Sequence, residues 1–312
     1  DQSIDVLDFY LEERRKLTEG VTIGGYFIHP WLYWHINFFR TPIPTRSGQE
    51  VIMNPPLDDN IIYTIDSYKE AEDRNMGLAL FGSRGVTKST TISSLVTWLN
   101  TSKPNGTTSI MGTSDGDLKA ISKLLGIGFN SVHPALFVPQ LVSDWDSNIE
   151  FGVKEKGGFR LPHSHVSLTN MNKGTSKSSE KGAGLSPIGS VWDEIGKASI
   201  KKILQSALPS FKTQYGAKLV HVLAGTTGNQ ELSKDARDIL TDPEAFDLIT
   251  MDWDRLERRV DPEYITWNRS KKEKFSIFFP GQMSYRLPVE KLETTLSDFL
   301  GIKDASLEKI RI

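Results

Sequence analysis

The stretch from Gly77 to Thr90 limits the possible folds more than any other part of the sequence. The apolar run 77–81 has the character of a short strand, and it leads through Gly82-Ser83-Arg84-Gly85-Val86-Thr87 into Lys88-Ser89-Thr90. A phosphate-binding loop of the pattern G-x-x-x-x-G-K-[ST] supplies inward-pointing backbone N–H groups, a lysine for the phosphate oxygens and a hydroxyl for Mg²⁺. Gly82, Lys88 and Ser89 keep that spacing. Residues 82–90 are therefore predicted to bind a nucleotide.

One position departs from the pattern. Thr87 stands where the second glycine is expected, and a β-branched residue there costs roughly 1–3 kcal/mol if the loop requires a positive φ. The residues that follow have helical periodicity, since Ile92, Leu95, Val96 and Leu99 lie at i, i+3, i+4 and i+7. Strand, loop and helix are thus in the required order. The alternative is a glycine-bearing turn before an ordinary helix with a solvated lysine.

A phosphate-binding loop needs a carboxylate partner, and an adjacent acid pair ends a second apolar segment, 188–192. Asp193 is predicted to hold Mg²⁺, directly or through water, and Glu194 to polarise the attacking water as a general base. An isolated Asp-Glu pair in a chain with 39 acidic residues is more often solvated surface. Its place after a buried-type strand favours the functional interpretation.

A third strand candidate, 218–224, runs into the small polar residues Gly225-Thr226-Thr227-Gly228-Asn229. Ligands of open α/β sheets lie at the carboxyl ends of the strands, so Thr226 and Thr227 are candidates for sensing the γ-phosphate. An ordinary strand-to-helix turn, in which Asn229 caps a helix through about Leu240, is an equal alternative.

Together these segments resemble the ATPase half of the large terminase subunit, the motor that packages DNA into procapsids of tailed phages and herpesvirus-type viruses. Gly82-Ser83-Arg84-Gly85 before Lys88-Ser89 looks like the variant Walker A motif of that family. Val191-Trp192-Asp193-Glu194 looks like its Walker B motif with the catalytic glutamate, and Ala224-Gly225-Thr226-Thr227 looks like its coupling motif. The aromatic run 24–39 is similar to a segment that precedes the loop in some members, so the resemblance spans roughly residues 20–230.

The resemblance implies an α/β fold, a P-loop NTPase of the ASCE type with a mostly parallel sheet and helices on both faces. It implies ATP and Mg²⁺ as cofactors, Ser89 and Asp193 as metal ligands, and Glu194, Arg84 and Lys88 as catalytic residues. A guanidinium in the loop can neutralise charge on the transferring phosphoryl group. The implied partners are double-stranded DNA, a portal protein and a small terminase subunit. A homo-oligomeric ring in the cytoplasm of the infected host cell, outside the virion, is expected.

The chain is predicted to have three parts. Residues 1–59 form an extension, with a helix at 4–18 whose Ile4, Leu7 and Leu11 share a face, followed by the aromatic run and a proline-marked extended connection. Residues 60–248 form the ATPase core, which alternates strands and helices. The predicted core elements are 77–81, 89–99, 108–112, 115–125, 149–153, 163–170, 188–192, 198–208 and 218–224. Residues 249–312 form a lid or linker with a strand at 275–280, leading toward a C-terminal nuclease domain that this chain lacks.

Composition sets modest limits. At 312 residues and 38% hydrophobic, the chain can bury a sizeable core. The net charge of −2 means that contacts with nucleic acid must come from local patches. The absence of cysteine excludes disulfides and thiolate metal sites. The acidic start and the absence of an apolar run of about 18 residues lead us to expect a soluble, intracellular protein.

Three other clusters were weighed. The lysines of the segment 172–187, namely Lys173, Lys177 and Lys181, are candidates for contacting DNA phosphates, with a solvated linker as an equal alternative. His163 and His165 share one face of a strand, but no third ligand stands at a recognisable spacing, which disfavours a metal site. The Trp31, Tyr33 and Trp34 cluster is predicted to pack in the core rather than to stack on bases.

Two rival functions stay open: another P-loop remodeller such as a DEAD-like helicase, or a non-catalytic nucleotide-binding scaffold. Nuclease activity is not expected, because a nuclease needs carboxylates that converge on two metal ions, normally on a sheet. The acids of the tail are scattered, and solvated surface charge is the better interpretation for all of them: Asp252, Asp254, Asp261, Glu263, Glu290, Glu293, Asp298, Asp304 and Glu308.

Overall fold

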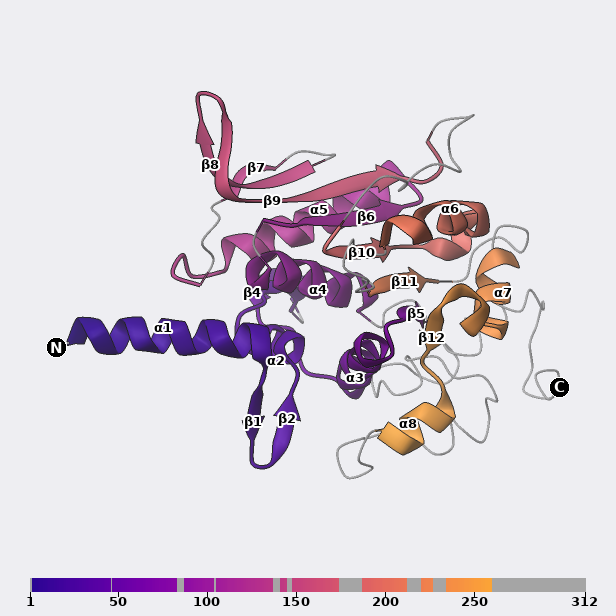
Figure 1. The fold of residues 1–312 in the computed structure, drawn as a ribbon, viewed down its shortest axis with the longest axis horizontal. Helices are drawn as coiled ribbons and strands as arrows, with labels where there is room; N and C mark the ends of the chain where they lie inside the picture. The colour runs from indigo at the N-terminus through magenta and orange to yellow at the C-terminus, as the bar shows by residue number, and fades with distance from the viewer. Residues whose placement is uncertain are drawn as a thin grey trace.

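The fold is built on one large sheet and two small hairpins, in a computed structural model (Figure 1). The structure describes residues 2–45, 47–82, 87–103, 105–136, 141–144, 148–173, 187–211, 220–226 and 234–259. The predicted strand 275–280, and all of the tail after residue 259, lie outside these ranges.

Eight strands form the large sheet, in the order β12-β5-β11-β10-β6-β9-β8-β7. Their bounds are β12 (Leu248–Thr250), β5 (Gly77–Phe81), β11 (His221–Gly225), β10 (Gly189–Trp192), β6 (Thr107–Gly112), β9 (Gly158–Asn170), β8 (Asn148–Glu155) and β7 (Leu141–Asp144). The first six strands in this order run parallel, while β8 and β7 are antiparallel to their neighbours. The predicted mostly parallel sheet is confirmed.

Alternate residues of the central strands pack into two separate cores, one on each face of the sheet. Leu78, Ile110 and Val191 belong to the larger core, whereas Phe81 and Trp192 point to the opposite face and belong to the smaller one. This alternation follows from the two-residue period of a strand. Because both faces are buried, the strands read as continuous apolar runs, which is typical of parallel sheets.

Helices cover both faces, as predicted. The larger core is covered by α3 (Asp59–Arg74), α4 (Lys88–Ser102) and α5 (Asp115–Asn130), and the smaller one by α6 (Ile200–Ala207) and α7 (Lys234–Thr241). A short helix, α8 (Trp253–Arg259), follows β12. The predicted core elements are all present, with ends that differ by a few residues. Helix α3 was not predicted, although Ile61, Ile65 and Tyr68 bury one face of it at helical spacing.

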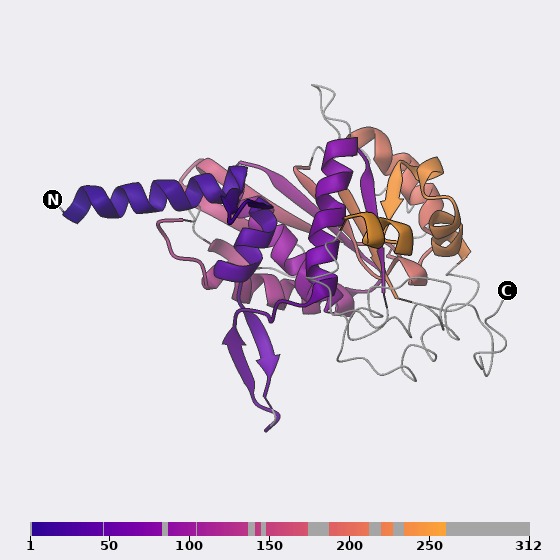
Figure 2. The same ribbon diagram turned by 90° about the horizontal axis from the view of Figure 1, so that it is seen from below.

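The N-terminal extension packs against the outside of α4. It contains α1 (Gln2–Glu19), α2 (Pro30–Asn37) and two hairpins, formed by β1 (Val21–Ile23) with β2 (Tyr26–Ile28) and by β3 (Thr41–Pro44) with β4 (Glu50–Met53). The predicted extended connection is therefore a hairpin in part. Figure 2 shows α1 projecting from the body of the molecule.

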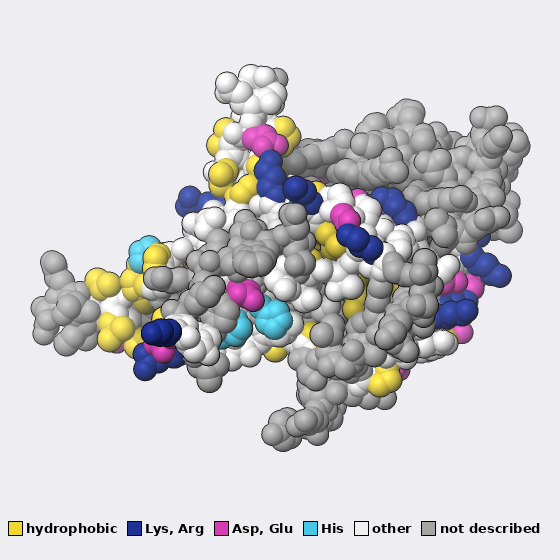
Figure 3. All heavy atoms as spheres, turned by 90° about the horizontal axis from the view of Figure 1, so that it is seen from above, with side chains coloured by type: hydrophobic (Ala, Val, Ile, Leu, Met, Phe, Trp, Pro, Cys, Tyr) yellow, Lys and Arg dark blue, Asp and Glu magenta, His cyan; other side chains and the backbone are white. Residues whose placement is uncertain are grey.

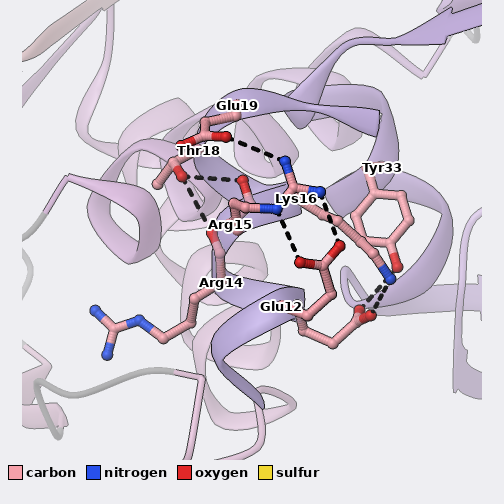
Figure 4. Close-up of polar contacts among 8 residues, drawn as sticks. Glu12, Arg14, Arg15, Lys16, Thr18, Glu19 and Tyr33 are labelled. Atoms are coloured by element: carbon pink, nitrogen blue, oxygen red, sulfur yellow. Dashed lines mark hydrogen bonds and ion pairs between the residues drawn. The ribbon is translucent and has the colours of Figure 1, made fainter. Parts of the chain in front are cut away.

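The helix predicted at the N-terminus is confirmed as α1, but the face that carries Leu7 and Leu11 is not the face that packs. Leu7 and Leu11 are more than half exposed, and the buried positions of the helix are Glu13 and Leu17. Glu13 pairs with Lys16 at 2.7 Å and accepts a hydrogen bond from the Tyr33 hydroxyl at 2.8 Å. Figure 4 shows the Lys16 and Tyr33 side chains beside each other. Periodicity identified the helix but not the side that packs, because a polar contact with α2 determines how α1 docks.

The aromatic cluster packs in the core, as predicted. Trp31 and Trp34 are almost completely buried and donate indole hydrogen bonds to Ser94 Oγ at 3.2 Å and Thr97 Oγ1 at 3.1 Å. Both acceptors lie on α4, one turn apart. The extension thereby braces the helix that begins at Lys88.

Candidate nucleotide-binding site

Parallel strands bring the three predicted motifs to one edge of the sheet. Gly82 follows β5, Asp193 follows β10 and Thr226 follows β11, which lies between β5 and β10. The turns are joined by the backbone, since Gly82 N–H donates to Gly225 O at 3.2 Å. A Cβ on Gly225 would lie 3.0 Å from Ile195 Cγ1 and 3.2 Å from Phe81 Cε1. Glycine at 225 therefore allows the strand ends to approach closely.

Lys88 bridges the two ends of the predicted phosphate loop. It is the first residue of α4, its side chain is buried, and its Nζ donates to Gly82 O at 3.0 Å. Ser89 and Thr90 lie in the first turn of the same helix, where backbone N–H groups favour anions. Ser83, Arg84, Gly85 and Val86 lie outside the described residues, so the predicted role of Arg84 stays a prediction.

Thr87 adopts the conformation in which a glycine was expected. Its φ of 58° and ψ of 22° place it in the left-handed region, and its side chain makes no capping hydrogen bond to α4. Its carbonyl instead accepts from the backbone N–H of Thr91 at 2.9 Å. The loop therefore does require a positive φ at this position, at a steric cost that a β-branched residue cannot avoid.

Asp193 is a buried carboxyl, with only 4% of the residue exposed. Burial raises its pKa to about 6, and the nearby charges of Glu194 and Asp117 add to that rise. The charge of Lys88 and a backbone hydrogen bond from Glu194 act in the opposite direction. Lys88 and Asp193 are thus close enough for the charge of one to affect the protonation of the other.

Glu194 lies at the start of a single turn of 3-10 helix, η2 (Ile195–Lys197), and also has a positive φ, 55°. Its Oε2 accepts from Thr226 Oγ1 at 2.5 Å and lies 3.4 Å from Lys197 Nζ. Lys197 Nζ is in turn 3.9 Å from Asp117 Oδ1. The carboxylate is therefore fixed from the neighbouring strand and from its own turn.

The structure brings Gly82, Lys88, Asp193, Glu194 and Thr226 together, as the sequence predicts. Thr227 lies outside the described residues. The sequence interpretation missed Lys197 and Asp117, whose contacts join the turn after β10 to the start of α5. The only sequence signal was the spacing of Lys197, three residues after Glu194.

The other clusters lie away from this edge or are paired internally. His163 and His165 stack at 6.0 Å between ring centroids, and Thr107 Oγ1 bonds the His165 ring. Lys173 pairs with Asp115 at 3.0 Å, whereas Lys177 and Lys181 lie outside the described residues. Figure 3 shows Lys and Arg side chains in separate groups on one face of the molecule.

Two features are absent from the described part of the chain. No group of three or more His, Cys, Asp or Glu residues there is placed to hold a metal ion. Within the same ranges, no helix has the length and apolar character that spanning a bilayer requires.

No protein-family model matches the sequence, and no curated protein matches it significantly. Among solved structures, the large terminase of bacteriophage HK97 is similar over 86% of this chain and 50% of its own, with a TM-score of 0.50 and 12% identity. This chain thus spans about half the length of the HK97 protein.

Two further structures are similar at lower scores. The large terminase ATPase domain of a Thermus phage matches over 75% of this chain and 92% of its own, with a TM-score of 0.45 and 11% identity. The large terminase of a thermophilic bacteriophage in complex with ADP matches over 74% and 53%, with a TM-score of 0.43 and 15% identity. The mostly parallel α/β fold of this chain is thus similar to the fold of the HK97 large terminase.

Proposed function

We propose that this chain is the ATP-hydrolysing motor of a viral large terminase and drives double-stranded DNA into procapsids. The observation that carries the proposal is the convergence of Lys88, Asp193, Glu194 and Thr226 at the carboxyl ends of three adjacent parallel strands. In open α/β sheets, ligands bind at this edge.

The residues divide the chemistry between them. Lys88 exchanges its contact with the Gly82 carbonyl for the phosphates of ATP, at the positive end of the α4 dipole. Glu194 accepts a proton from the attacking water, and Thr226 holds the glutamate and reports the state of the γ-phosphate to β11. Arg84 neutralises charge that develops on the transferring phosphoryl group.

The residues present fit a magnesium ion. Asp193 is buried with a raised pKa, so its ionised form is unfavourable unless a cation is nearby. The Ser89 hydroxyl and the Asp193 carboxylate would hold Mg²⁺, which would offset the negative charge of the phosphates. One or two protein ligands suffice, because Mg²⁺ usually keeps waters and substrate phosphates as its other ligands.

The wider assembly follows from the same proposal. The motor works as a ring on double-stranded DNA, docked on a portal protein and recruited through a small subunit, in the host cytoplasm. With a net charge of −2, this chain would contact DNA through local groups of basic residues rather than through a broad basic surface; Figure 3 shows Lys and Arg in separate groups on one face.

ATP turnover measured with and without linear double-stranded DNA tests the proposal. The wild-type chain should hydrolyse ATP faster when DNA is present. Lys88→Ala should weaken ATP binding by at least about 10²-fold, since a buried charge-assisted phosphate contact is lost. Lys123→Ala, an exposed lysine of α5, is the matched control and should bind ATP like wild type.

The alternatives predict different results. ATP binding without turnover would show a nucleotide-binding scaffold, and strand separation of a forked duplex would show a helicase. Plasmid nicking that requires Mg²⁺ or Mn²⁺ and disappears with EDTA would contradict the expected lack of nuclease activity.

A further inference from the structure

We propose that Lys197 is a positioning residue for Glu194. With Thr226 it holds one oxygen of the glutamate, so that the other oxygen is presented to the attacking water. The inference rests on the proposed function, because it takes Glu194 as the general base.

Both contacts go to the same oxygen. Thr226 Oγ1 donates to Glu194 Oε2 at 2.5 Å, and Lys197 Nζ lies 3.4 Å from that atom. A hydrogen bond and an ion pair on the same oxygen limit the rotation of the carboxylate, while the second oxygen keeps its lone pairs for a proton. A base that a third group orients is the arrangement found in activated nucleophile systems.

The backbone sets the position of Lys197. The positive φ of Glu194 starts the 3-10 turn, and Lys197 N–H donates to Glu194 O at 2.9 Å. Residues three apart in such a turn eclipse one another, so the ammonium lies beside the carboxylate of Glu194. The left-handed backbone conformation of Glu194 therefore helps to place Lys197 beside the glutamate carboxylate.

Asp117 anchors the far side of Lys197. Its Oδ1 lies 3.9 Å from Lys197 Nζ, while its Oδ2 accepts from Ser114 Oγ at 2.7 Å and from Thr113 Oγ1 at 3.2 Å. The Asp117 N–H donates to Ser114 Oγ at 3.1 Å, which completes a reciprocal cap at the start of α5. The cap fixes Asp117, and Asp117 holds Lys197 toward the turn after β10.

The two lysines of the site therefore have different partners. Lys88 acts on Asp193 and the Gly82 carbonyl, on the side of the phosphate loop. Lys197 is shared between Glu194 and Asp117. Removing Lys197 should leave nucleotide binding intact and disturb only the orientation of the base.

The test separates kcat from KM in Lys197→Met and Lys197→Arg. Lys197→Met should lower kcat roughly 10-fold, because a misoriented base loses part of its advantage, with KM and the ATP Kd within about twofold of wild type. Lys197→Arg should recover most of the loss, since a guanidinium can donate to the same oxygen. Lys202→Ala, an exposed lysine of α6, is the control and should leave kcat unchanged.

A double variant separates the loss of positioning from a folding defect. In a Glu194→Gln background, Lys197→Met should cause no further loss, since residues that act as a unit are not additive. Wild-type or raised kcat in Lys197→Met, or a change in KM alone, would overturn the inference while the ATPase assignment stands. Absence of turnover in the wild-type chain would instead overturn the proposed function.

Discussion

The turn after β5 and the turn after β10 have the same unusual backbone conformation for different reasons. In the first, Thr87 has a φ of 58°, and in the second, Glu194 has a φ of 55°. At Thr87 the left-handed conformation serves the backbone of a loop. At Glu194 it aims a side chain.

The other positive-φ residues show how unusual these two are. Among the described residues, five that are not glycine have a positive φ, and three of them are Asn75, Asn105 and Asp247. Asn and Asp tolerate this region because their short polar side chains bond locally. Thr and Glu lack that advantage. Strained residues concentrate at functional sites, and both of these lie at the proposed ATP site.

The side chains show the difference. The Thr87 residue is exposed and its hydroxyl does not cap α4. The Glu194 carboxylate is held by Thr226 and Lys197. Glycine should therefore replace Thr87 without loss of ATPase activity. Glu194, in contrast, should need a carboxylate at its position.

The largest effect is expected from Glu194→Gln. Loss of the general base should lower ATP turnover by about 10²-fold or more, while ATP binding is retained because Lys88 is untouched. Single-turnover hydrolysis and equilibrium nucleotide binding measure the two effects. Glu19→Gln, on the exposed surface of α1, is the control. Unchanged turnover in Glu194→Gln would contradict the role of Glu194 as general base, and with it the functional explanation of its positive φ.

Asp193→Asn should stabilise the nucleotide-free protein at pH 8. The folded-state pKa of about 6 lies above the ordinary value of 3.8, so folding favours the protonated carboxyl. The protonated Asp193 therefore contributes to the free energy of unfolding in full below about pH 4, and this contribution is lost as the pH rises through 6. A neutral Asn at this position avoids that loss. For a pKa shift of this size the loss amounts to about 2–3 kcal/mol.

Urea unfolding at pH 8, 6 and 4 measures the effect. The advantage of Asp193→Asn should be largest at pH 8 and vanish near pH 4. Asp8→Asn, at an exposed position of α1, should show no such trend. A gain that is equal at all three pH values would mean that packing, not charge burial, causes it.

The smallest effect is expected from Thr87→Gly. Relief of the β-branched strain, less the greater freedom of glycine in the unfolded chain, should raise the free energy of unfolding by about 1 kcal/mol. ATP binding should tighten or turnover rise. The matched control is Asn75→Gly at the left-handed end of α3, where a smaller gain is expected because Asn already tolerates this conformation. Loss of activity in Thr87→Gly would show that the threonine itself contacts the nucleotide.

Part of this site could be predicted from local pattern. Gly82 and Lys88 are predicted by the spacing of a phosphate-binding loop after an apolar run, and Asp193 and Glu194 by their place directly after a second apolar run. Lys197 and Asp117 were missed because their contact joins the turn after β10 to the first turn of α5, and no local periodicity encodes that distance.

The sequence by itself determined the mostly parallel α/β sheet and the start of a helix near Lys88, since the alternation of apolar runs with helical segments is a local property. Only the tertiary structure decided which side of α1 packs, how Trp31 and Trp34 brace α4, and which cation holds Glu194. The packing of α1 and of the two tryptophans depends on polar contacts between distant segments, and Lys197, although it contacts Glu194 within one turn, also lies beside Asp117 of α5. Such contacts require partners that the packing of the whole sheet brings within about 3 Å of one another.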